Sequence, residues 1–190
     1  MATVFIAGSI TIKQLDFLVQ ERIMNIIHMG HEVIVGDANG VDTSIQQFLL
    51  SEAYQRVTVF CTGDSPRNNV GNWKVQAVTT YHKPGSRAFF TAKDIALADA
   101  ADTGFMIWDT KSTGTLSNVI ELLSQKKYSW VFVNKDREFH AVKKADDLET
   151  LLACMSQSAR LKADTKIGLT EKLAFLHSRE MQMAQVSERA

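Results

Sequence analysis

Short apolar runs alternate with segments of helical periodicity along most of this chain, and this alternation restricts the fold more than any other feature. Continuous apolar runs are typical of strands that are buried on both faces. We predict strands over residues 3–7, 32–35, 57–61, 104–108 and 130–133. Because helical segments separate them, the strands should be joined by right-handed crossovers. The sequence therefore predicts an α/β, Rossmann-like three-layer sandwich with a mainly parallel five-stranded sheet.

Two regions depart from the alternation. Residues 62–86 contain both prolines, and we interpret them as an excursion at the strand ends with one short helix over Trp73–Val78. Phe139–Val142 is a candidate for a further short edge strand. We interpret residues 162–166 as a linker and Leu169–Ser187 as an amphipathic helix.

The chain is accordingly divided into a Rossmann-like domain over residues 1–155 and a helical C-terminal extension over 156–190. Two interpretations of the last helix stay open, because an amphipathic face can pack on its own domain or on a second copy of the chain. We expect a homo-oligomer, as a dimer or a larger assembly.

Charge and composition restrict the partners. Lys and Arg total 21, Asp and Glu also total 21, and the formal net charge is zero. A neutral chain offers no electrostatic attraction for non-specific nucleic-acid or membrane binding. The 2 cysteines stand in unlike contexts, which fits a reducing compartment, and no apolar run reaches the roughly 18 residues of a membrane span. We expect a cytoplasmic protein without a membrane or nucleic-acid partner.

Three loops have the composition of a ligand site. They follow the first, second and fourth predicted strands, and ligands of open parallel sheets bind at the carboxyl ends of the strands. Glycine lets the backbone approach a ligand, and the amino end of the next helix favours phosphate or carboxylate groups. The candidate ligand-binding residues are Gly8, Ser9, Gly36, Asn39, Gly40, Asp42, Asp109, Ser112, Gly114, Thr115 and Asn118.

Other residues could complete such a site. Aromatic rings stack on bases, and Trp73, Tyr81 and Phe90 are the candidates for that role. The basic side chains of Lys83, Arg87 and Lys93 could supply positive charge to a phosphate, with a solvated loop as the alternative. We expect no required cofactor.

Three aspartates are a candidate magnesium site. Asp37, Asp42 and Asp109 follow predicted strands, and carboxylates at strand ends are typical Mg²⁺ ligands. A helix dipole also favours Asp42 in the first helical turn, so a purely structural role for this residue is the alternative.

The segment Gly36-Asp37-Ala38-Asn39-Gly40-Val41-Asp42 resembles the G-G-x-x-G-x-D signature of the SLOG superfamily of Rossmann-like nucleotide-ligand domains. The block from Trp108 to Thr115 is similar both to that group, which includes YpsA-like and lonely-guy proteins, and to nucleoside 2-deoxyribosyltransferases. The resemblance covers residues 3–133. It implies a nucleotide-derived ligand, such as a nucleotide, an ADP-ribose-like molecule or a cyclic nucleotide.

One departure from this pattern concerns catalysis. The resembling transferases and phosphoribohydrolases carry a glutamate where this chain has Asn118, and an amide cannot attack an anomeric carbon. The remaining catalytic candidates are Asp109, Glu121 and Asp42. Three hypotheses follow: a sensor or carrier of a nucleotide-derived molecule, a nucleoside or nucleotide N-glycosidase or deoxyribosyltransferase-like enzyme, and a protein that binds single-stranded DNA.

Overall fold

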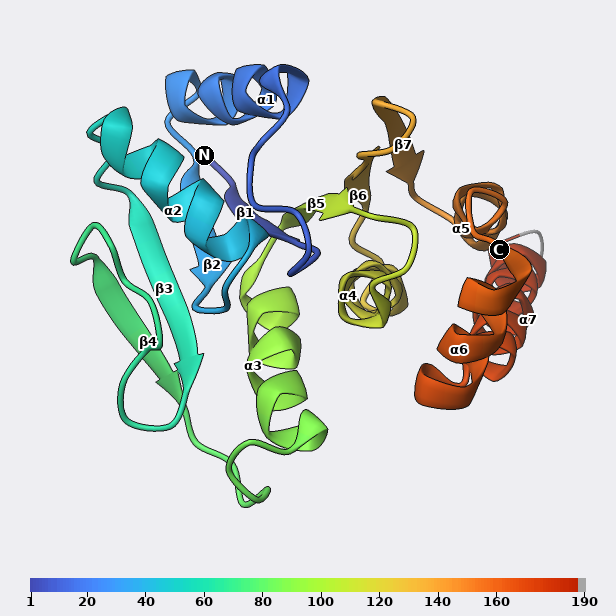
Figure 1. Cartoon of the computed structure of the whole chain (residues 1–190). Coiled ribbons are helices and arrows are strands. Elements are labelled where there is room, and N and C mark those ends of the chain that lie inside the picture. Colours follow the sequence, from blue (N-terminus) through green and yellow to red (C-terminus); the bar gives the residue numbers. More distant parts are fainter. Residues whose placement is uncertain (188–190) are drawn as a thin grey trace.

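The structure is a computed structural model that describes residues 1–187, and it contains one sheet of seven strands with helices on both faces (Figure 1). The strands are β1 (Thr3–Gly8), β2 (Glu32–Gly36), β3 (Val57–Thr62), β4 (Lys74–Val78), β5 (Thr103–Trp108), β6 (Ser129–Val133) and β7 (Glu138–Val142). The helices are α1 (Phe17–His28), α2 (Val41–Ser51), α3 (Arg87–Ala100), α4 (Thr113–Ser124), α5 (Ala145–Leu152), α6 (Gln157–Ile167) and α7 (Leu169–Ser187).

The order of the strands places the chain reversal at the centre of the sheet. The order is β4-β3-β2-β1-β5-β6-β7, and every neighbouring pair is parallel except β6 with β7. The chain runs outward from β1 to β4, then returns to place β5 on the other side of β1. The crossovers before and after this return therefore lie on opposite faces, with α1 and α2 on one face and α3 and α4 on the other (Figure 1).

Alternate residues of the central strands supply two apolar layers. In β1, Phe5 packs with the layer of α3 and α4, whereas Ile6 packs with the layer of α1 and α2. Both side chains are fully buried. A strand covered on both faces needs a continuous apolar run, which is the pattern that identified β1 in the sequence.

The expected fold class is correct in its coarse form, but the number of strands is not. The segment Trp73–Val78 does not form the expected short helix, because residues 74–78 form the edge strand β4 beside β3. The β-branched Val75 pairs with Val59, and Trp73 packs into the core beside it. The candidate edge strand near Phe139 is confirmed as β7.

The expected linker over residues 162–166 is also wrong, since these residues belong to α6. Ser156 caps the start of this helix by accepting from the Ala159 amide, and Gly168 ends it in the left-handed conformation with φ of 62°. Ala159 and Ala163 lie one turn apart and are both buried. The mostly polar helix α6 therefore packs on the domain through these two small side chains.

The C-terminal helices pack on the α4 side of the sheet (Figure 1). Leu169 and Leu176 of α7 are 4% and 2% exposed and belong to the same apolar cluster as α4 and α5. The Ala145 amide donates to Glu180 Oε1 at 2.8 Å, and Arg179 donates to the Ser124 carbonyl. The last helix therefore packs on its own domain, and the homo-oligomer stays a prediction.

No helix within residues 1–187 combines the length and the apolar character that a membrane span requires.

We predict that Leu176→Ala lowers the free energy of unfolding by about 2–5 kcal/mol, because it leaves a cavity in the core. Its neighbour Phe175 is 60% exposed, so Phe175→Ala is the matched control and should change stability by less than about 0.5 kcal/mol. Urea denaturation followed by circular dichroism measures both. Equal effects of the two substitutions would mean that α7 does not dock as described.

Candidate functional site

A pocket of about 250 Å³ lies at the carboxyl edge of the sheet, where the strand order reverses. Ligands of open α/β sheets bind at this topological switch point. The pocket lies between the ends of β1 and β2, the loop before α4 and one face of α3. Its lining residues are Phe5, Ala7, Gly8, Ile10, Gly36, Ala38, Asp42, Arg67, Phe90, Lys93, Asp94, Leu97, Ser112, Gly114, Thr115 and Asn118.

The loop from Asp109 to Ser112 forms the wall at the start of α4. Asp109 accepts hydrogen bonds from the amides of Lys111 and Ser112, at 2.9 and 2.6 Å, and from Thr11 Oγ1 at 2.7 Å. Burial acts to raise the pKa of Asp109, but these hydrogen bonds outweigh it and the net pKa is lowered. The loop also contains Thr110 in the left-handed conformation, with φ of 64°. Asp109 is therefore an ionised carboxylate that holds a sharp turn.

The amino end of α4 faces the pocket. Ser112 Oγ accepts from the Thr115 amide at 3.4 Å, while the first N–H groups of a helix have no acceptor inside it. A Cβ at Gly114 would have only Ser112 Oγ nearby, at 3.9 Å, so the space in front of this residue is open. Ser9 Oγ accepts from the Asp109 amide at 3.0 Å and lies 3.3 Å from Thr115 Oγ1. The end of β1 thus fixes the loop of α4.

Gly36 allows two charged side chains to lie against the backbone of β2. A Cβ on this residue would lie 2.4 Å from Asp42 Oδ2 and 2.7 Å from Lys93 Nζ. The main chain accepts a further hydrogen bond there, from Gln46 Nε2 to the Gly36 carbonyl at 2.9 Å. Asp42 and Lys93 are 5% and 4% exposed, so glycine is required for charged groups to be placed this deeply.

A buried cluster of charges surrounds Lys93. Its Nζ lies 3.0 Å from Asp94 Oδ1 and 3.9 Å from Asp37 Oδ1. Burial acts to lower the pKa of Lys93, but Asp94, Asp42 and Asp37 around it raise the pKa overall, so the amine is protonated. The pocket therefore contains a fixed positive charge that water barely reaches.

Asp42 is the carboxyl whose protonation depends on pH near neutrality. Burial raises its pKa to about 6, and the positive charge of Lys93 opposes this effect only in part. Its Oδ2 accepts from the Ala38 amide at 3.2 Å. A carboxyl group with such a pKa can donate or accept a proton at physiological pH.

The excursion between β3 and β4 brings Arg67 to the pocket. Its guanidinium lies 2.6 Å from Asp37 Oδ1 and 4.5 Å from the centre of the Phe90 ring. Burial acts to raise the pKa of Asp37, but hydrogen bonds from Arg67 and the charge of Lys93 lower it overall. The next residue, Asn68, donates from Nδ2 to the Asp37 carbonyl at 2.8 Å. Two consecutive residues of the excursion are therefore held by Asp37.

The structure brings together most of the residues that the sequence predicts for the site. Those that line the pocket are Gly8, Gly36, Asp42, Phe90, Ser112, Gly114, Thr115 and Asn118. Ser9 and Asp109 lie behind them and shape the loop of α4. Both groups come from loops at the carboxyl edge, which is where parallel topology places them.

The other predicted residues do not line the pocket, because each has a different environment. Gly40 packs against Ile10, whose carbonyl would lie 2.3 Å from an added Cβ, and Asn39 is exposed and accepts from Asn68 Nδ2. Trp73 is buried in the core and its Nε1 donates to the Tyr54 carbonyl, so it cannot stack on a ligand in this pocket.

Tyr81 and Glu121 are also outside the pocket. Tyr81 is 94% exposed, and its ring lies beside that of His82 with 4.5 Å between the centroids. Glu121 Oε1 accepts from Gln125 Nε2 one turn further along α4. One turn past Asn118, the helix has already moved away from the sheet edge.

The three aspartates considered for magnesium do not form one site. Asp37 pairs with Arg67, Asp42 lies beside Lys93, and Asp109 accepts hydrogen bonds from its own loop and from Thr11. Within residues 1–187, no group of three or more metal-ligating side chains is present. Arg67 and Lys93 supply the positive charge beside Asp37 and Asp42, in the place that a metal ion would take.

Arg67, Asp94 and Asp37 belong to the pocket or its charge cluster. The sequence analysis gave no role to Arg67 or Asp94 and considered Asp37 only as a magnesium ligand. For Asp94 a signal existed, because Phe90, Lys93 and Leu97 stand at helical spacing around it and mark one face of α3. Arg67 had no such signal. Its place depends on a loop whose path the sequence pattern does not indicate.

No protein-family model matches this chain, and no curated protein or solved structure is significantly similar to it.

We predict that Gly36→Ala lowers the free energy of unfolding by about 1–3 kcal/mol, because its Cβ would push Asp42 or Lys93 out of position. Gly114→Ala is the matched control. Its Cβ meets open space, and alanine favours a helix, so stability should stay the same or rise slightly. Thermal unfolding at one pH compares them, and a Gly36→Ala protein as stable as wild type would contradict the close packing at this residue.

We predict that Asp42→Asn stabilises the protein by about 2–3 kcal/mol above pH 6 and has little effect near pH 4. The folded-state pKa of Asp42, about 6, lies above the ordinary value of 3.8, so the folded protein holds this proton more tightly than the unfolded chain. The stability that the protonated group contributes is lost as the pH rises through 6. Asparagine has no such titration and keeps an acceptor for the Ala38 amide.

Urea denaturation at pH 4 and pH 7.5 tests this prediction, with the exposed Asp64→Asn as control. A difference from wild type that is the same at both pH values would mean that Asp42 does not titrate in this range.

Proposed function

We propose that this protein binds a nucleotide-derived small molecule in the pocket at the carboxyl edge of its sheet, as a sensor or carrier. The observation that carries the proposal is the position of the pocket: it lies at the switch point between β1 and β5 and is lined by glycines and a helix amino end. Such sites bind the phosphate and sugar parts of nucleotides because backbone amides can reach them closely.

Each wall then has a role. The amino end of α4, with Ser112, Gly114 and Thr115, binds the phosphate or another anionic group. Phe90 and the guanidinium that lies over it offer a flat surface for a base or ribose. A volume of about 250 Å³ suits a small ligand or the enclosed part of a larger one. The SLOG-like glycine segment supports the same class of ligand.

A second candidate function, cleavage or transfer of an N-glycosidic bond, is favoured by one observation. Asp42 is a buried carboxyl in the pocket with a pKa of about 6, which suits a general acid or base. Asp42 would then supply the carboxyl group that the resembling enzymes have as a glutamate at the position of Asn118. Asp109 is less suited, because its oxygens already accept several hydrogen bonds.

A thermal-shift screen against nucleosides, nucleoside mono-, di- and triphosphates, NAD, ADP-ribose and cyclic nucleotides tests the proposal. A ligand present at about 100 times its Kd should stabilise the protein by about 2.7 kcal/mol. Chromatography of each hit separates the two candidates. Intact ligand supports binding alone, and released base that Asp42→Asn abolishes supports the enzyme.

Gly114→Ala locates the binding site, because the added methyl group enters the pocket without destabilising α4. We expect this variant to lose the shift, whereas Ser117→Ala on the same helix, which does not line the pocket, should retain it. A screen in which no compound shifts the wild-type protein would overturn the proposal. So would a shift that Gly114→Ala leaves unchanged.

A further inference from the structure

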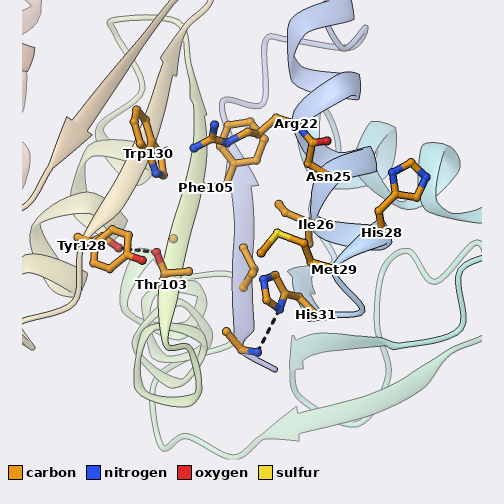
Figure 2. Close-up of a pocket in the computed structure, with 13 residues that line it drawn as sticks. Arg22, Asn25, Ile26, His28, Met29, His31, Thr103, Phe105, Tyr128 and Trp130 are labelled. Carbon is orange, nitrogen blue, oxygen red and sulfur yellow. Dashed lines mark hydrogen bonds between the residues drawn. The ribbon is translucent and has the colours of Figure 1, made fainter.

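A larger pocket, of about 520 Å³, opens at the amino edge of the sheet, on the side away from the candidate site. Val4 of β1 and Phe105 of β5, both almost fully buried, form its floor. Its walls are α1 on one side and, on the other, Tyr128 just before β6 and Trp130 within it (Figure 2). The volume falls in the range of small-molecule sites, and most of the lining is apolar.

This pocket exists because the face of the sheet that carries α1 and α2 is covered unevenly. On this face α2 packs closely over β1 and β2, while the apolar layer continues to β3, β5 and β6. Helices α3 to α7 lie on the other face (Figure 1). Trp130 and Phe139 of the last two strands are consequently only half-buried at the edge of the layer. Partly exposed aromatic rings beside a concave apolar surface are typical of ligand sites rather than of simple core packing.

The polar groups of the pocket favour an anion. Arg22 reaches across from α1, and its guanidinium carbon lies 4.4 Å from the centre of the Trp130 ring and 5.6 Å from that of Phe139 (Figure 2). Among the residues that the structure describes, Arg22 forms no ion pair, and no carboxylate lines the pocket. The arginine is therefore held in place by the rings alone, with its charge unmatched.

Two further residues supply hydrogen-bond donors. His31 Nδ1 accepts from the Ala2 amide at 3.1 Å, so the proton of the neutral imidazole is on Nε2. Asn25 projects from α1 next to Arg22, and its amide can donate as well (Figure 2). The donors and the cation thus come from α1 and the residues just after it, and the guanidinium lies against the face of Trp130.

From this arrangement we propose that the amino-edge pocket binds a small aromatic carboxylate, with its ring on the apolar floor of Val4 and Phe105 and its carboxylate on the guanidinium that Trp130 holds. A guanidinium stacked on a ring keeps its N–H edge available for a bidentate carboxylate. The apolar floor excludes a highly charged phosphate ester, which would lose its hydration for one arginine. The site is separate from the carboxyl-edge pocket, and the proposal stands whether or not that pocket binds a nucleotide.

Isothermal titration calorimetry with indole-3-acetate tests the proposal, with indole-3-acetamide as the neutral probe of the same shape. We expect saturable binding of the acid to one site and at least tenfold weaker binding of the amide. Arg22→Gln should weaken binding of the acid at least tenfold. Asn25→Trp, which fills the pocket from an exposed position, should abolish it. The control Arg160→Gln removes an exposed guanidinium on α6 and should bind like wild type.

Three outcomes would overturn the proposal: no saturable heat with the acid up to about 1 mM, equal affinity for acid and amide, or binding that neither pocket variant weakens. Circular dichroism first establishes that each variant is folded. Should Arg22→Gln fail to fold, Asn25→Trp and the comparison of the two probes still decide the matter.

Discussion

The pairing of β1 with β5 is the contact on which the other features depend. Because β5 joins the sheet on the side of β1 opposite β2, the helices that follow β1 and β5 lie on different faces, and their connecting loops separate at the carboxyl edge. The carboxyl-edge pocket occupies that separation. Gly8 ends β1 there, and a Cβ on it would lie 2.3 Å from the Ile107 carbonyl, so only glycine fits at this point of the pairing. The order of the strands thus determines where the pocket lies, and the side chains determine what lines it.

Charge inside this pocket is balanced locally and not by solvent. Lys93 is surrounded by carboxylates from β2's loop, from α2 and from α3 itself, while Arg67 comes from a loop that is distant in sequence. Removing Asp37 or Asp94 would leave Lys93 buried with less negative charge around it, which is destabilising. Asp42 is the exception, because burial disfavours its charged form more than Lys93 favours it. A ligand that brings an anionic group to α4 therefore meets a site whose own charges are already satisfied, and helix amides remain the groups open to it.

Much of this architecture was accessible from the sequence, and the failures have specific causes. Apolar runs located the five central parallel strands, since strands buried on both faces cannot be polar. Edge strand β4 was missed because Lys74 and Gln76 interrupt its apolar residues, as an exposed edge permits. The glycine-rich loops indicated many of the residues that line the carboxyl-edge pocket. Trp73 instead lies in the core, because a tryptophan in a loop-like segment has the same sequence pattern whether it faces a ligand or the core. Arg67 depends on the path of a long connection, and local pattern does not encode such paths.

The three tryptophans occupy three different environments, which gives the protein built-in optical probes. Trp108 is 1% exposed and donates from Nε1 to the Ser112 carbonyl, so its emission senses the loop that begins α4. Trp130 lines the amino-edge pocket beneath a guanidinium, and Trp73 lies in the core away from both pockets. Replacing two of the three at a time would leave one fluorophore per protein. Titrating the variant that keeps Trp108 and the variant that keeps Trp130 would then report on each edge of the sheet separately, without an attached dye.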